Sequence, residues 1–186
     1  DAQEVMRFNH SGNVGIGTTA FNNYWSGYTV LKLGADNGFF SNTASGTGSA
    51  LFIAQNVYND GSIYRHIIEN QSGLVDMRDG KFSFLTSPSG AAGAAATMTN
   101  RFTILQAGNV GIGTTSPGYK LDVAGEIGLD SYLRHNGDSD TFFGFSGNDE
   151  IKFRTAGSDR VFINSTGNVG IGVTSFTAGV KLEVAG

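Results

Sequence analysis

The chain has 186 residues, of which 28 are glycine, 2 are proline and none is cysteine. Glycine is about twice its usual share of roughly 7%, which is typical of a turn-rich all-β chain. Lys and Arg number 12 against 16 Asp and Glu, a net charge of −4, and no basic cluster marks a nucleic-acid-binding surface. No apolar run is long enough to insert into a membrane, and disulfides and thiolate metal sites are excluded.

The phrase Gly-Asn-Val-Gly-Ile-Gly occurs at 12–17 and returns at 108–113 and 167–172. Alternating apolar residues stand before and after each copy. Each unit therefore predicts a strand, a Gly-Asn turn, a short Val-x-Ile strand, a loop and a further strand. The copies are too distant and too unevenly spaced for a solenoid with coils of roughly 20 to 50 residues.

Each repeat unit carries too few apolar side chains to form a core alone, so it needs neighbouring units. Because the copies within one chain are unevenly spaced, we expect these neighbours to come from other chains, which associate around an axis. We expect the alternate glycines to let neighbouring backbones approach closely there. The residues expected in this shared core all alternate along the predicted strands: Val14, Ile16, Val110, Ile112, Leu121, Val123, Val169, Ile171, Leu182 and Val184.

Along the chain, this organisation predicts five segments. They are shaft repeats at 1–34, 101–125 and 160–186, a β insert at 35–100 and a smaller β insert at 126–159. Apolar runs in the first insert predict strands at 50–58, 63–69, 74–77 and 81–85, with turns at 59–61, 71–73 and 79–80. They indicate a small antiparallel sheet or sandwich. The second insert predicts strands near 132–133, 142–145 and 151–153.

Residues 108–117, Gly-Asn-Val-Gly-Ile-Gly-Thr-Thr-Ser-Pro, are followed by Lys-Leu-Asp-Val-Ala-Gly at 120–125. This pattern resembles the shaft repeat of phage tail fibres and related fibrous adhesins, particularly those of marine and cyanobacterial phages. Both inserts resemble modules found between such repeats. The resemblance implies an elongated homotrimeric β-fibre with short shaft repeats and small antiparallel β knobs, extracellular and on the virion. The first repeat departs from the pattern, because residues 21–28 replace the short Ser-Pro loop.

Two local patterns invite a ligand-binding interpretation. Residues 15–20 fit the dinucleotide fingerprint G-x-G-x-x-A, but that site needs a helix after the glycines, and the repeats predict a strand. Residues 136–140 place oxygen ligands at alternate positions as a calcium loop does, but the bidentate Glu at the twelfth position is missing. The sequence predicts no cofactor and no metal.

Catalytic residue types are present without a recognisable constellation. The histidines, His10, His66 and His135, are scattered along the sequence. Asp76 and Asp79 indicate the charged end of a hairpin. Glu69 could join them as a carboxylate pair for glycoside hydrolysis, which needs a separation of about 5 to 9.5 Å. We expect no enzymatic activity.

Aromatic residues gather around the longest shaft loop and the insert after it. An exposed ring can stack on the C–H face of a sugar while polar neighbours bind its hydroxyls. The alternative is that these rings belong to the core of the β insert or to the trimer interface. The candidate receptor contacts are Tyr24, Trp25, Tyr28, Phe39, Tyr58 and Tyr64.

The sequence therefore predicts a structural and host-attachment segment of a phage tail fibre. Its expected partners are further copies of itself and a glycan or protein of the host surface. Two alternatives stay open, namely a fragment of a polysaccharide-depolymerising tailspike and a bacterial surface adhesin built from the same repeats.

Overall fold

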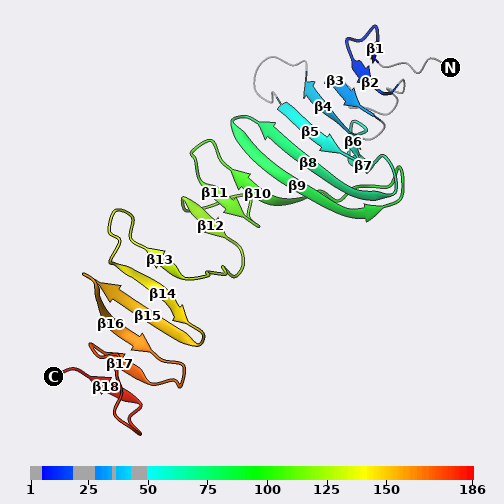
Figure 1. The fold of residues 1–186 in the computed structure, drawn as a ribbon. Coiled ribbons are helices and arrows are strands. Elements are labelled where there is room, and N and C mark those ends of the chain that lie inside the picture. Colours follow the sequence, from blue (N-terminus) through cyan, green and yellow to red (C-terminus); the bar gives the residue numbers. More distant parts are fainter. Residues whose placement is uncertain (1–5, 19–27, 35–36, 43–49) are drawn as a thin grey trace. The chain divides into compact units, whose positions relative to one another are not determined.

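The computed structural model describes residues 6–18, 28–34, 37–42 and 50–186 (Figure 1). These residues form strands and turns without a helix, which confirms the predicted all-β class. In the described part of the chain no helix exists that could cross a membrane. The strands are β1 (Met6–Phe8), β2 (Val14–Ile16), β3 (Tyr28–Leu33), β4 (Asn37–Asn42), β5 (Ala50–Gln55), β6 (Val57–Asn59), β7 (Tyr64–His66), β8 (Asn70–Arg78), β9 (Lys81–Gly90), β10 (Thr99–Ile104), β11 (Val110–Ile112), β12 (Leu121–Val123), β13 (Tyr132–Arg134), β14 (Phe142–Gly147), β15 (Glu150–Thr155), β16 (Ser158–Ile163), β17 (Val169–Ile171) and β18 (Leu182–Val184).

The chain divides into two compact units, Asp1–Glu126 and Ile127–Gly186. Unit 1 contains a ten-stranded sheet in the order β1-β2-β3-β4-β5-β8-β9-β10-β11-β12. The hairpin β6–β7 is a separate two-stranded sheet. Unit 2 is one six-stranded sheet in which β13 to β18 follow their order in the chain.

The three shaft repeats share one topology. In each, an antiparallel hairpin is followed by a third strand that returns parallel to the second, as in β10–β11–β12 and β16–β17–β18. The turn of each hairpin contains a glycine in the left-handed region, with φ of 80° at Gly12, 77° at Gly108 and 76° at Gly167. Glycine adopts this conformation without a steric penalty, which explains the repeated Gly-Asn turn.

The glycine between Val and Ile has a different role from the one expected. A Cβ on Gly111 would lie 2.5 Å from the carbonyl oxygen of Thr114, and one on Gly170 would lie 2.3 Å from that of Val173. Both oxygens belong to the loop that connects the second and third strands of the same repeat. The close approach is thus made by the chain's own loop, and the expectation that these glycines admit a neighbouring chain's backbone is wrong.

The first insert continues the sheet and forms no separate body. Strand β3 pairs with β4, and β10 spans the expected boundary at residue 100 while pairing with β9. In unit 2, β15 and β16 pair across the expected boundary at residue 159. Only the boundary after residue 125 falls near the division into units. Strands are present at the places predicted within both inserts, although the strand predicted at 50–58 divides at Asn56 into β5 and β6. The turn predicted at 71–73 is wrong, because these residues lie within β8, where Gly73 pairs with Gln55, and β4 had no counterpart in the prediction.

Unit 1 has its core on one face of the ten-stranded sheet. Phe40 and Phe52 are fully buried there, and Val57 at the start of the β6–β7 hairpin packs into the same cluster. The hairpin and the segment that follows β9 cover this face, and a bridge between Arg65 and Ala95 joins them. We call it the core face. Burial alternates along β5, so every second residue points to the opposite face.

Candidate functional site

The opposite face of the ten-stranded sheet carries a continuous apolar strip that no described residue covers. Directly paired residues form a row across all ten strands, and every member is apolar. We call this the apolar face of unit 1. The row reads Phe8, Val14, Leu31, Phe39, Ile53, Val75, Phe84, Phe102, Ile112 and Val123.

Several of these side chains are far more exposed than apolar residues of a finished core. Phe84 is 44% exposed, Ile53 41% and Ile112 43%, although each lies in the middle of a well-paired strand. Phe84 and Phe102 contact each other edge to face, with ring centroids 5.5 Å apart. Aromatic side chains that stay this exposed in the middle of a sheet leave apolar surface available to a further layer.

Unit 2 repeats this arrangement. Its sheet has a row of paired apolar residues on one face, which we call the apolar face of unit 2, and Phe143 and Phe153 stack in it with centroids 5.8 Å apart. Phe143 and Phe153 are each 45% exposed. The row reads Leu133, Phe143, Phe153, Val161, Ile171 and Val184.

All ten residues predicted for a shared core lie on these two apolar faces. The isoleucines and leucines among them are exposed, and Val14, Val110, Val123 and Val169 are half-buried. Strand pairing within one chain therefore collects these residues but does not bury them. The members are Val14, Ile16, Val110, Ile112, Leu121, Val123, Val169, Ile171, Leu182 and Val184.

Each apolar face is hollowed by a shallow groove. The groove of unit 1 has a volume of about 530 Å³ and lies over Gly73, between Phe39, Ile53 and Phe84. The groove of unit 2 has a volume of about 400 Å³ and is lined by Phe143 and other residues of the same face. Both grooves lie at the edge of the apolar strip, where polar residues begin.

The other face of unit 2 satisfies its own polar groups. Asp159 binds Lys152 Nζ at 3.0 Å and Arg154 Nε at 2.7 Å. Burial raises the pKa of Asp159, but these two cations outweigh it and hold the pKa below its ordinary value. Lys152 lies over the Phe162 ring and Arg154 over that of Phe142. This face thus contains paired charges, in contrast to the exposed rings of the apolar face.

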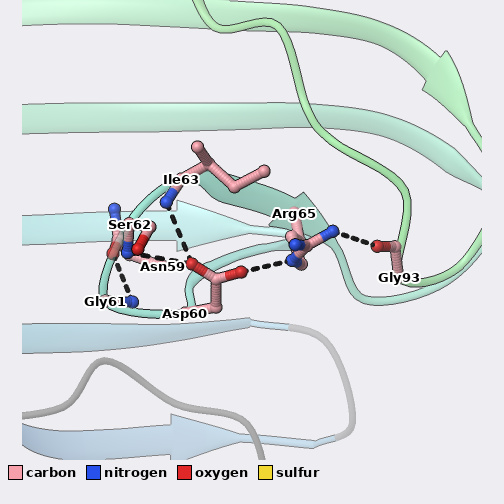
Figure 2. A network of polar contacts seen from close by, with 7 residues as sticks. All are labelled: Asn59, Asp60, Gly61, Ser62, Ile63, Arg65 and Gly93. Carbon is pink, nitrogen blue, oxygen red and sulfur yellow. Dashed lines mark hydrogen bonds and ion pairs between the residues drawn. The ribbon is translucent and has the colours of Figure 1, made fainter.

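The β6–β7 hairpin is fastened to unit 1 by polar contacts at both ends. Figure 2 shows Asp60 in the turn, where it accepts hydrogen bonds from the Ile63 and Ser62 amides and pairs with Arg65. Arg65 also donates to the Gly93 carbonyl at 3.0 Å. The Ile63 amide, Arg65 and the Ser62 amide lower the pKa of Asp60 to about 2.

At the base of the hairpin, three buried polar residues form a second network. Asn56, with φ of 55°, donates to the carbonyls of Ile68 and Gln71 at 3.2 and 2.9 Å. The Ser72 hydroxyl donates to the Asn56 carbonyl and lies 2.8 Å from His66 Nδ1. His66 is one of the histidines weighed for catalysis. Its place in this buried network gives it a structural role.

The structure does not bring the described candidate receptor contacts together. Tyr58 and Tyr64 pack against the buried cluster of the core face, whereas Phe39 lies on the apolar face. Tyr24 and Trp25 lie outside the described residues. Tyr28 begins β3.

The carboxylates weighed for catalysis differ in burial. Asp76 is largely buried beside Arg78, 3.1 Å away, and burial raises its pKa despite that cation. Glu69 and Asp79 are exposed. Among the described residues, no group of three or more His, Asp or Glu could hold a metal ion.

Strand pairing also identifies residues of the apolar faces that the sequence analysis missed. The predicted core residues belong to strips that extend through both inserts, to residues such as Phe82, Phe84 and Phe153. The signal for them was the period-2 pattern in the insert strands, which the prediction assigned to separate sheets. Comparison with protein-family models finds no match for this chain, and comparison with curated proteins finds none either.

Proposed function

We propose that this chain is a structural and host-attachment segment of a phage tail fibre, in which three copies pack their apolar faces around a common axis. The single observation that carries the assembly is the uninterrupted row of apolar residues across the ten strands of unit 1, all of them exposed or half-buried. Its counterpart in unit 2 supports the same arrangement. The number three and the place on the virion rest on the likeness of the repeated phrase to tail-fibre shafts.

Burial of these faces would supply the core that a single chain lacks. Removing apolar surface from water contributes roughly 25 cal/mol per Å². A side chain such as Phe84, nearly half exposed in one chain, would become part of a packed interior. The core faces, covered in unit 1 by the β6–β7 hairpin, would then point outward and present the surface available to a host glycan or protein.

The assembly is tested by changing one exposed residue of the apolar face. Ile112 is 43% exposed, so Ile112→Asp leaves the charge solvated in a single chain and buries it only in an assembly. We expect the wild-type chain to have a molar mass three times 19.5 kDa by sedimentation equilibrium, and the variant to be a folded monomer.

Thr115→Asp is the matched control, because Thr115 is exposed on the connecting loop of the same repeat, away from the apolar face. This variant should keep the wild-type mass. A wild-type mass of 19.5 kDa would overturn the proposal, and a mass of twice that value would replace the trimer with a dimer.

A further inference from the structure

Two amide side chains interrupt the apolar face of unit 1. Asn37 on β4 and Gln55 on β5 are direct cross-strand neighbours, and both are exposed. They stand two residues from Phe39 and Ile53 on the same strands, and therefore on the same face. Together with Gly73, which pairs with Gln55, they line the groove of about 530 Å³.

The structure gives neither amide a hydrogen-bond partner in the described part of the chain. A primary amide offers two donors and an acceptor, and its burial without partners is unfavourable. The corresponding polar edge of unit 2 differs, because Thr141 bonds to Asp138 and His135 lies 3.8 Å from the same carboxylate. Asn37 and Gln55 thus form a cross-strand pair of amides without a hydrogen-bond partner among the described residues.

The row from Phe8 to Val123 does not define how two copies align. It is apolar through all ten strands, so displacing one copy by a strand, about 4.8 Å, still places apolar side chains of this row on apolar side chains. A polar group within an apolar interface removes such degeneracy, because only one alignment satisfies its hydrogen bonds.

We infer that Asn37 and Gln55 set the register of the assembly by hydrogen bonding to the same pair of residues on neighbouring copies. This inference rests on the proposed function, since it requires the apolar faces to meet. A second copy is the partner that fits, because an amide is both donor and acceptor and so complements another copy of itself. The groove over Gly73 provides room for the neighbour's side chains.

The inference is tested by replacing both amides with leucine in the full chain and measuring the alignment of the copies. The chain has no cysteine, so a spin label at Thr97→Cys, an exposed position after β9, reports distances between copies by pulsed electron paramagnetic resonance. We expect one distance between copies in the otherwise wild-type assembly and several in Asn37→Leu/Gln55→Leu. The assembly of the leucine variant should have a molar mass equal to or larger than that of the wild type.

The matched control exchanges the two amides, Asn37→Gln with Gln55→Asn, and should retain one distance. A single unchanged distance in the leucine variant would overturn the register inference while leaving the trimer in place. If the exchanged amides behave like the leucines, side-chain length and not hydrogen bonding sets the register. A wild-type chain that is monomeric would overturn both proposals.

Discussion

Gly111 and Gly113 are required for different physical reasons. Gly111 lies under the loop of its own repeat, where an added Cβ would be 2.5 Å from the Thr114 carbonyl oxygen. Gly113 has φ of 74°, a conformation that side chains disfavour. The same pair of constraints applies to Gly170 and Gly172 in the third repeat. Two glycines separated by one residue therefore encode the tight return from β11 to β12.

We expect Gly111→Ala to destabilise unit 1 by roughly 1 to 3 kcal/mol or more, because a backbone carbonyl cannot move aside as a flexible side chain can. Gly128→Ala is the control, since a Cβ there meets nothing within 4 Å. Urea unfolding followed by circular dichroism measures both. Equal stability of the two variants would show that the loop can shift at no cost.

Asp76 illustrates how burial controls a charge in this sheet. Its Oδ1 atom is buried without a hydrogen-bond partner, and the Ser83 hydroxyl directly across the strand pair is in the same situation. Burial raises the pKa of Asp76, and the nearby Arg78 only partly opposes this. The charged form of Asp76 is thus less favourable in the folded chain than in the unfolded one.

A raised pKa in the folded state means that the contribution of Asp76 to stability is largest below its unfolded pKa. That contribution is lost as the pH rises through the folded value. We therefore expect the free energy of unfolding of Asp76→Asn, relative to wild type, to increase from pH 3 to pH 7. Urea unfolding at a series of pH values measures this difference. A difference that is constant with pH would contradict the raised pKa.

At the scale of the element, the β6–β7 hairpin is held by polar contacts at both ends. It is only three residues per strand, and an isolated short hairpin is marginally stable in water. Asn56 and Ser72 hold its base, Asp60 and Arg65 order its turn, and Val57 inserts into the core. This combination explains how such a short element stays packed on the core face.

For the hairpin we predict opposite pH behaviour to that of Asp76. The pKa of Asp60 is lowered to about 2, so its bonds contribute stability above the unfolded pKa, and this contribution is lost as the pH falls through about 2. Following the Ile63 amide by nuclear magnetic resonance should give a titration midpoint near 2. At pH 7, Asp60→Asn should speed hydrogen exchange at this amide, while exchange in β8 stays unchanged. A midpoint near 4 would refute the network.

At the scale of the whole molecule, the proposed assembly makes folding and association interdependent. The apolar faces of both units are uncovered in one chain. In unit 1 only the core face is covered, and in unit 2 the opposite face has paired charges around Asp159. Association of native chains stabilises them by mass action, so that the apparent stability depends on concentration.

We expect the melting temperature of the wild-type chain to rise by several degrees over a hundredfold increase in protein concentration. Ile112→Asp should melt at one lower temperature at all concentrations, whereas Thr115→Asp should follow the wild type. Differential scanning calorimetry measures this. A wild-type melting temperature that does not depend on concentration would argue against a reversible assembly.

The sequence by itself determined the all-β class, the three repeats and most strands. Period-2 alternation and glycine turns are local properties that a single segment such as 108–125 already contains. It also placed Val110 and Ile112 on one face of their sheet, and Leu182 and Val184 on one face of theirs, because alternation fixes which side chains share a face.

Only the tertiary structure decided how these segments join. The parallel return of β12 on β11, the continuation of the sheet through β4 to β9 and the separation of Phe39 from Tyr58 all depend on pairing between distant residues. Local patterns do not specify which strand is the neighbour of another. The role of Gly111 was misjudged for the same reason, because the Thr114 carbonyl reaches it only once the loop has folded back over the strand.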